Sequence, residues 1–375
     1  MKRRDSILLA LFLGTATIGS IVAYKNQKES KLLSDEINVV ALLPLTGTSS
    51  DIGRWQQQGI EIAKTSLNAD PTQPKKVSVL YEDTASDVKT ALSSFEKTSA
   101  TAASNAYLIS LSSVANALAP RFSSNNQPAL LLAVSLPKIT QRSDNYFRFN
   151  LGSEQEAERM AEYLKTTELK RIAVLSINDE FGQGAREAFL RNLKGSSASI
   201  VYDDAYDKNQ TDFRSIILRQ SNSKPDAVYV IGYVKSSILL IRQMRELGVK
   251  SRVFANMALS VPAFQRLGGT ALDGATYTVT DFRLDSPAPR TQQFIKAYQE
   301  RYRETPTFFA AFAHDSLITL AQAKATSPQA PLRTSLNHLK PFDAATGTIK
   351  FNDLRNLVLK VRVVRNINGN LVDIH

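Results

Sequence analysis

Two serines stand where a strand pattern gives way to a helix pattern. Ser112 and Ser113 directly follow the apolar stretch AYLISL, and helical spacing begins at the next residue. In a sheet of parallel strands, small ligands bind beyond the carboxyl ends of the strands, where unpaired N–H groups and the dipole of the next helix attract an anion. A serine at such a position also caps many helices that bind nothing. The local stretch leaves both interpretations open.

Two further loops place small hydroxyl side chains after apolar strand patterns. Thr46 lies in LPLTGTSSDIG after the first strand, and Ser135 follows ALLLAV, with Ala133 close by at the end of that stretch. Residues of these types also form ordinary turns, so neither loop alone indicates a site. If the three strands belong to one sheet, their ends form a single polar surface. We then expect a small polar ligand to bind there.

The sequence contains no recognised catalytic or metal-binding pattern. Only three histidines occur, His314, His338 and His375, and no nucleophile elbow, zinc-protease, phosphate-loop or calcium-loop spacing is found. The stretch FGQG lacks the third glycine of a dinucleotide fingerprint. A hydrolase that used Ser112 or Ser113 would lack a base. We therefore expect a binding protein rather than an enzyme, with no catalytic residue, metal or cofactor.

Composition and charge narrow the class further. The chain has 375 residues and no cysteine, which excludes disulfides, thiol catalysis and lipid attachment at an N-terminal cysteine. The net charge is +11, of which +4 falls in residues 1–31, which contain six basic and two acidic residues. The remaining +7 is spread without a basic stripe interleaved with aromatic residues, so we expect no nucleic-acid partner. Weak attraction to anionic surfaces is the alternative.

The first 36 residues read as a leader and a spacer. The basic start MKRR precedes a charge-free apolar segment, residues 6–24, in the order that an export signal requires. The segment is also close to the length of about 20 residues that spans a bilayer. A cleaved signal peptide and an uncleaved anchor in the inner membrane are both consistent with it. Either one predicts a periplasmic or other extracytoplasmic location.

From residue 37 onwards, strand patterns alternate with helical patterns about every 20 to 30 residues. This spacing is typical of βαβ units and predicts an α/β fold with parallel sheets. Two series of units begin alike, each with a strand, a loop containing an acid and a glycine, and a helix; the loops are TSSDIGRW and INDEFGQG. After residue 274 the pattern changes to three helices and a final pair of strands. Asn368 and Gly369 predict a tight hairpin between those strands.

The order of these motifs resembles the type I periplasmic substrate-binding proteins of branched-chain amino acid transport. INVVALLPLTG with IGRWQQQGIEIA is similar to that family's first strand, loop and helix, and VSVLYEDTASDVKTALSSFEK is similar to the second set. SLSSVANALAP, LLLAVSLPKIT and NYFRFNLGSEQEAERMAEYL resemble its central block. RIAVLSINDEFGQG, DAVYVIGY, IRQMRELGV and TGTIKFND extend the match. Each motif is weak alone, but the shared order covers nearly the whole chain after residue 37.

The resemblance implies two Rossmann-like lobes with parallel sheets, joined by three hinge crossovers and closing on a small ligand. It places the crossovers near residues 149–152, 278–283 and 346–351. The implied domains are the leader and spacer at 1–36, lobe 1 at 37–150 and 281–345, and lobe 2 at 151–280 and 346–375.

The resemblance also assigns ligand contacts. It places the ligand's carboxylate at Ser113 and at the loop that carries Ala133 and Ser135, and it places closing aromatic rings at Phe181 and Tyr233. The polar surface described above adds Thr46 and Ser112 to this set.

Two positions depart from the family pattern. Ile52 stands where an aromatic residue often precedes the glycine of the first helix, with Trp55 one turn further on. Met257 stands where amino acid binders carry the acid that pairs with the ligand's ammonium group. An unpaired buried cation costs several kcal/mol, so a carboxylate or an amide without an ammonium group fits better than a free amino acid. The alternative is that Asp51, Asp179 or Glu180 of this chain replaces the missing acid, and a free amino acid would then fit.

Together these features lead us to expect an extracytoplasmic solute-binding protein. It would be a monomer that captures a small polar ligand, such as an amino acid-like compound, an amide or a carboxylate, and delivers it to the permease of an ABC transporter. The alternative is a membrane-anchored receptor or envelope regulatory scaffold of the same fold. Residues 6–24 and the lost acid both favour this alternative.

Overall fold

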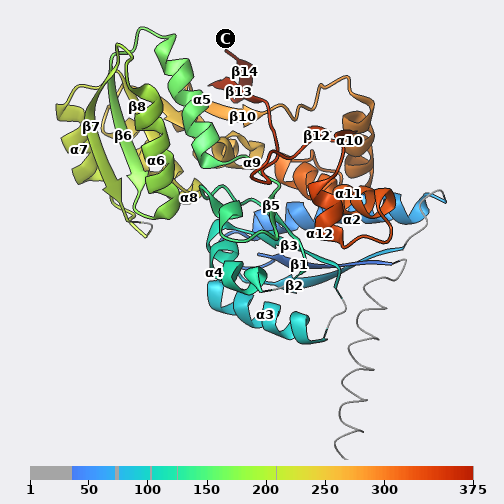
Figure 1. Ribbon diagram of the computed structural model, residues 1–375. Coiled ribbons are helices and arrows are strands. Elements are labelled where there is room, and N and C mark those ends of the chain that lie inside the picture. Colours follow the sequence, from blue (N-terminus) through green and yellow to red (C-terminus); the bar gives the residue numbers. More distant parts are fainter. Residues whose placement is uncertain (1–35, 72–75, 102–103, 125, 208, 375) are drawn as a thin grey trace, which may run out of the picture.

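The computed structural model describes residues 36–71, 76–101, 104–124, 126–207 and 209–374. The proposed leader and His375 lie outside these residues. Figure 1 shows two α/β halves side by side, each built around its own sheet. No helix in the described ranges has the length and apolar character needed to cross a membrane.

The first half contains a parallel sheet with the strand order β2-β1-β3-β4-β5. Its strands are β1 (Ile37–Leu43), β2 (Val77–Asp83), β3 (Ala106–Ser110), β4 (Ala129–Leu132) and β5 (Tyr146–Arg148). The helices between them are α2 (Ser50–Ala69), α3 (Val88–Thr101), α4 (Ser112–Ser123) and the 3₁₀ helix η1 (Ile139–Gln141). Every residue of β3 and β4 is buried, as expected for central parallel strands that are covered on both faces.

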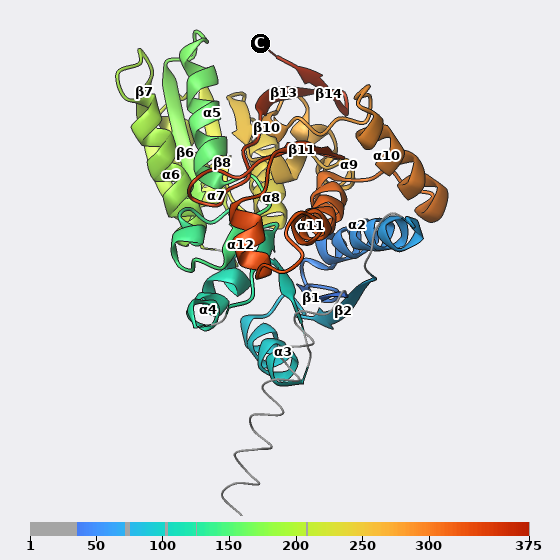
Figure 2. The same cartoon turned by 45° about the vertical axis from the view of Figure 1, so that its right-hand side comes forward.

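Three later helices join this half: α10 (Pro289–Tyr302), α11 (Phe308–Thr326) and α12 (Leu332–Asn337). Helices α2 and α11 lie side by side in both views of the molecule, on the face of the sheet opposite α3 (Figures 1 and 2). Gly59 of α2 permits this close approach, because a Cβ there would collide with the carbonyl oxygen of Ala310. A short hairpin, β11 (Phe342–Ala344) and β12 (Gly347–Ile349), follows α12.

The second half contains a sheet with the order β14-β13-β10-β9-β8-β6-β7. Its strands are β6 (Arg171–Ile177), β7 (Ser199–Tyr206), β8 (Ala227–Ile231), β9 (Arg252–Ala255), β10 (Thr276–Thr280), β13 (Val361–Ile367) and β14 (Asn370–Asp373). Its helices are α5 (Ser153–Lys165), α6 (Glu180–Leu193), α7 (Arg214–Asn222), α8 (Val234–Glu246), η2 (Met257–Ser260), α9 (Pro262–Gly268) and η3 (Gly269–Leu272). The pairing is parallel from β7 to β10 and antiparallel from β10 to β14.

The predicted fold class is confirmed, and so is the C-terminal hairpin. Ile367 pairs with Asn370, and Asn368 and Gly369 between them both have positive φ. The sequence pattern predicts a helix from Gly184 to Leu193, but α6 begins four residues earlier, at Glu180. Asp179 caps it by accepting a hydrogen bond from the Gly182 backbone N at 2.9 Å. Phe181 therefore lies in the first turn of α6 rather than in a loop.

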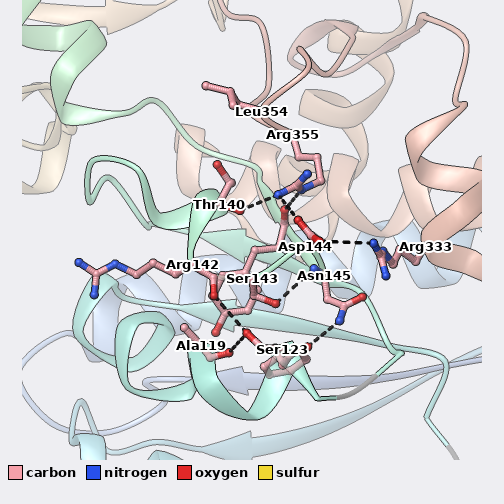
Figure 3. A network of polar contacts seen from close by, with 12 residues as sticks. Ala119, Ser123, Thr140, Arg142, Ser143, Asp144, Asn145, Arg333, Leu354 and Arg355 are labelled. Atoms are coloured by element: carbon pink, nitrogen blue, oxygen red, sulfur yellow. Dashed lines mark hydrogen bonds and ion pairs between the residues drawn. The ribbon is translucent and has the colours of Figure 1, made fainter.

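Residues 351–357 form a strap that lies along β5 before the chain joins the second sheet. The backbone N of Arg148 donates to the carbonyl of Arg355 at 2.9 Å, and the backbone N of Leu357 donates back to the carbonyl of Arg148 at 3.0 Å. The Arg355 side chain also donates to the Thr140 carbonyl at 2.7 Å and to Asp144 at 3.2 Å (Figure 3). These hydrogen bonds attach the strap to the first half. The residue bounds given above for the two lobes stay a prediction.

Candidate functional site

The sheet order brings the three predicted hydroxyl loops to one edge. Strands β1, β3 and β4 are consecutive neighbours in the parallel sheet, so their carboxyl ends lie together. Thr46 follows β1, Ser112 and Ser113 open α4 after β3, and Ser135 follows β4. We call this edge, with Ala133, the polar wall.

Asp83 at the end of β2 holds the Thr46 loop in place. Its carboxylate accepts hydrogen bonds from the Thr46 hydroxyl at 2.6 Å and from the backbone N of Leu45 and Ala85 at 2.9 and 2.7 Å. Burial alone would raise the pKa of Asp83, but these hydrogen bonds outweigh it and lower the pKa. The hydroxyl proton of Thr46 is thus committed to the loop, and only its oxygen lone pairs remain for a ligand.

The two serine loops are joined directly. The backbone N of Ser135 donates to the Ser112 hydroxyl oxygen at 3.2 Å. Ser113, by contrast, is exposed and makes no hydrogen bond to any described residue. Within the polar wall, Ser112 therefore supports the loop, while the Ser113 hydroxyl is available to a ligand at the N-terminus of α4.

The backbone of the polar wall is held in an unusual conformation. Leu111 and Ala133, at the ends of the adjacent strands β3 and β4, have φ values of 74° and 47°. A left-handed conformation costs a residue with a Cβ about 1–2 kcal/mol. Such strain persists only where the surrounding structure enforces it, and it concentrates at functional sites. The observation supports a ligand role for these strand ends over simple helix capping.

The second half supplies two stacked aromatic rings. The rings of Phe181 and Tyr233 lie 5.5 Å apart at an angle of 15°. The Tyr233 hydroxyl donates to Asp179 at 2.8 Å. Phe181 is 5% exposed and Tyr233 is 46% exposed, so Phe181 forms the base of the stack and Tyr233 its open face.

Polar contacts join the two halves close to the polar wall and to the rings. Asn116 of α4 donates to Glu180 of α6 at 3.3 Å, and Arg142 forms an ion pair with Glu180. Asn116 lies one helical turn after Ser113, on the same helix face. Glu180 is the neighbour of Phe181 in the chain. These contacts place the start of α4 against the start of α6.

Met257 does not belong to the stack of Phe181 and Tyr233 but packs among other apolar side chains. It is 3% exposed and belongs to an apolar cluster with Trp55 of α2, whose ring lies 5.6 Å from that of Phe264 in an edge-on arrangement. This cluster joins the two halves through apolar contacts rather than through a charge.

A carboxyl group that the sequence reasoning missed lies behind Met257. Glu156 accepts hydrogen bonds from the Met257 backbone N at 2.6 Å and from the Thr278 hydroxyl at 3.1 Å. Complete burial raises its pKa to about 7, despite these two hydrogen bonds, which lower it. One signal was present in the sequence. Glu156 precedes Met160 by four residues, so it lies on the buried face of α5.

The three acids considered as substitutes differ in their surroundings. Asp179 accepts hydrogen bonds from the Gly182 backbone N and the Tyr233 hydroxyl. Glu180 accepts a hydrogen bond from Asn116 and forms an ion pair with Arg142. Asp51 is exposed and has no ion pair with a described residue.

The described residues contain no cluster of metal-binding side chains. No set of three or more histidine, aspartate and glutamate side chains there could hold a metal ion. His314 is bonded to Asp315 through Nδ1 at 2.7 Å, within α11, and no hydrogen bond joins a described histidine to either serine. The geometry suits ligand binding through a hydroxyl, helix N–H groups and aromatic rings.

Comparison with known sequences places the chain among binding proteins. A family model described as "Periplasmic binding protein" matches residues 36–368. The Leu/Ile/Val-binding protein homolog 3 of Brucella melitensis is 25% identical over 328 residues, covering 86% of this chain and 89% of that protein. BraC3, a Leu/Ile/Val-binding protein of Rhizobium johnstonii, is 24% identical, covering 92% and 93%.

Solved structures share the fold. A leucine-binding protein, LivK, from Thermotoga maritima has a TM-score of 0.82 at 22% identity and covers 90% of this chain and 98% of its own. A solute-binding protein from R. palustris in complex with benzoate has a TM-score of 0.79 at 18% identity and covers 90% and 95%. The match over nearly the whole length agrees with the resemblance read from the motifs, and the chain belongs to the periplasmic binding protein family.

Proposed function

We propose that this chain is an extracytoplasmic solute-binding protein that captures a small ligand between its two halves. The observation that carries the proposal is the contact of Asn116 with Glu180, which brings α4, the helix that begins with Ser112 and Ser113, against the first turn of α6, which bears Phe181. A ligand that touches both halves binds only when they are closed, so its binding energy shifts the population towards the closed form. The partner would be an ABC-type permease, and the binding protein would act as a monomer.

For the ligand, we propose a carboxylate or an amide without an ammonium group. The N-terminus of α4 favours a negative charge next to Ser113. In the second half, Met257 is apolar and buried, and Glu156, the acid that accepts a hydrogen bond from its backbone N, has a pKa of about 7. Glu156 is therefore a poor fixed counter-charge at neutral pH. Relatives of this fold include both an isoleucine complex and a benzoate complex, so the fold admits either kind of ligand.

The proposal is tested by thermal-shift screening of the purified chain against amino acids, amides, urea-like compounds, and aromatic and aliphatic acids. A true ligand at about 100 times its dissociation constant adds about 2.7 kcal/mol to the free energy of unfolding. We expect carboxylates or amides to give this shift. The double variant Ser113→Ala with Ser135→Ala should abolish the shift and leave the unliganded melting temperature unchanged.

The matched control is Ser93→Ala on the exposed face of α3, which should keep the full shift. An unchanged shift in the double variant would put the ligand site elsewhere. A shift given by amino acids alone would contradict the proposed ligand class.

The alternative function is a membrane-anchored receptor or envelope regulatory scaffold of the same fold. The apolar segment 6–24 favours it, because a retained segment would tether the protein to the inner membrane. N-terminal sequencing of the mature protein separates the two functions. A start after the segment supports the diffusing binding protein, and a retained segment supports the tethered one.

A further inference from the structure

A cavity that opens to solvent lies within the first half, away from the contact between α4 and α6. It has a volume of about 580 Å³ and is lined by residues of α2, α10, α11 and β11. Ligand pockets in proteins typically measure about 300–1,000 Å³, so this cavity is large enough for a small organic molecule. Figures 1 and 2 show these helices together, on the face of the first sheet opposite α3. No group of the polar wall lines it.

The floor of the cavity is apolar. Ile62, Phe294, Ala321 and Ala344 line it and are each less than 9% exposed. They come from four different elements, so the floor is a product of tertiary packing and not of one amphipathic helix. An apolar body of a ligand would lose its contact with water here, which favours binding.

His314 lines the cavity, and its orientation is set by contacts with Asp315 and Phe294. Its Nδ1 is 2.7 Å from the Asp315 carboxylate, and its ring lies 4.7 Å from that of Phe294. Asp315 is fully buried and accepts further hydrogen bonds from the backbone N of Ala345 and Thr346, at 3.0 and 2.7 Å. Nε2 of His314 has no hydrogen-bond partner among the described residues. A side chain positioned this way is suited to meet a polar group of a ligand.

The rim carries charges of both signs, the acids Asp70, Glu300 and Asp343 and the arginines Arg290 and Arg301, and Arg290 is the arginine without a partner among the described residues. Arg301 donates to Thr65 at 3.0 Å and lies 3.7 Å from Glu61, and Glu300 lies 3.9 Å from Lys296. Arg290 lines the cavity from the first turn of α10, is exposed, and has no ion pair or hydrogen bond to a described residue. A guanidinium in this position matches a carboxylate, and the positive end of the helix dipole adds to the attraction.

We propose that this cavity is a second ligand site, which takes an apolar monocarboxylate with its tail on the floor and its carboxylate at Arg290. The site is independent of the polar wall and of the function proposed above. Octanoate is a suitable probe because it has one carboxylate and a flexible apolar tail. Octanol and octylamine, with the same tail but without the negative charge, are its matched controls.

The test is calorimetric titration of the full chain with octanoate. In the Ser113→Ala, Ser135→Ala double variant, which removes the polar wall, we expect one saturable site to remain. Arg290→Gln should weaken octanoate binding about tenfold or more, since it removes a hydrogen bond to a charged group. Ala297→Phe, which fills the cavity from α10, should abolish binding. Octanol and octylamine should bind more weakly than octanoate.

The matched control is Arg303→Gln, an exposed arginine at the end of the same helix that does not line the cavity, and it should bind octanoate as the parent does. The proposal is overturned if no saturable site remains in the double variant, or if Arg290→Gln binds as tightly as Arg303→Gln. Arg290 is exposed, so its replacement tests binding even if Ala297→Phe fails to fold.

Discussion

The two halves differ in the kind of side chains that they carry near the contact between α4 and α6. The polar wall consists of small side chains whose positions are set by the backbone: Leu111 and Ala133 are left-handed, and the Ser112 and Ser135 loops are joined by a hydrogen bond. The opposite side consists of large side chains set by packing, namely the Phe181 and Tyr233 stack and the buried Met257.

This difference suits the two halves to two different roles in ligand binding. Backbone geometry cannot change without refolding a strand end, so the polar wall is suited to holding the one group that all ligands of a class share. Ring and methionine contacts change with a single substitution, so the other side is suited to selecting among ligands by shape. Three changes should break or sharpen this contrast.

The largest effect is expected from Phe181→Ala. Phe181 is 5% exposed, so truncation removes a buried ring from the base of the stack and should cost about 3 kcal/mol of unfolding free energy. Tyr233→Phe keeps the stack and removes only the hydrogen bond to Asp179, which should cost less than about 1 kcal/mol. Urea unfolding of both variants measures the difference. Equal costs would contradict the division between the base and the open face of the stack.

An effect of similar size is expected in the dependence of stability on pH through Glu156. Burial raises its pKa from 4.5 to about 7 in the folded protein. The folded state then binds more protons than the unfolded state over this interval, so the free energy of unfolding falls as pH rises from 4.5 to about 7. The loss should be about 3 kcal/mol.

Glu156→Gln removes this titration and should flatten that part of the pH profile. Urea unfolding of the parent and the variant around pH 4.5 and around pH 7 checks it. Glu162→Gln, an exposed position on the same helix, serves as the control and should keep the parent profile. The same slope in Glu156→Gln would show that the buried acid is not its source.

The smallest effect is expected from Ala133→Gly in the polar wall. Glycine adopts the left-handed conformation without strain, so the substitution should stabilise the protein by about 0.5 kcal/mol after the entropy of the unfolded chain is counted. Ala117→Gly within α4 should instead destabilise by about 1 kcal/mol. Thermal unfolding gives both signs. Destabilisation of similar size at both positions would mean that the wall stores no strain.

Much of the fold could be predicted from sequence because its signals are local. Apolar runs such as AYLISL and ALLLAV became central strands, and the Asn368 and Gly369 turn became a hairpin. The start of α6 was placed too late because the pattern gave no weight to Asp179 as a cap. The ligand roles of Thr46, Ser112, Ser113, Ala133, Ser135, Phe181, Tyr233 and Met257 stay predictions.

The site was less accessible to sequence reasoning than the fold. Glu156 lies 101 positions from the Met257 backbone that it bonds, and no local signal couples the two. The pairing of Glu180 with Arg142 likewise depends on how two separate sheets are placed. The cavity near His314 forms from elements that are distant in the chain, so no local sequence pattern indicates it.

The order of hydrophobic runs, turn residues and small hydroxyl loops determined two α/β halves and the edge of the first sheet where a ligand would lie, because backbone periodicity and turn chemistry act over a few residues. Only the tertiary structure decided which hydroxyl stays unbonded, which buried acid has its pKa raised to about 7, and which two rings stack on each other. Those properties depend on distances between residues far apart in the chain, and burial and charge pairing exist only once the halves are packed together.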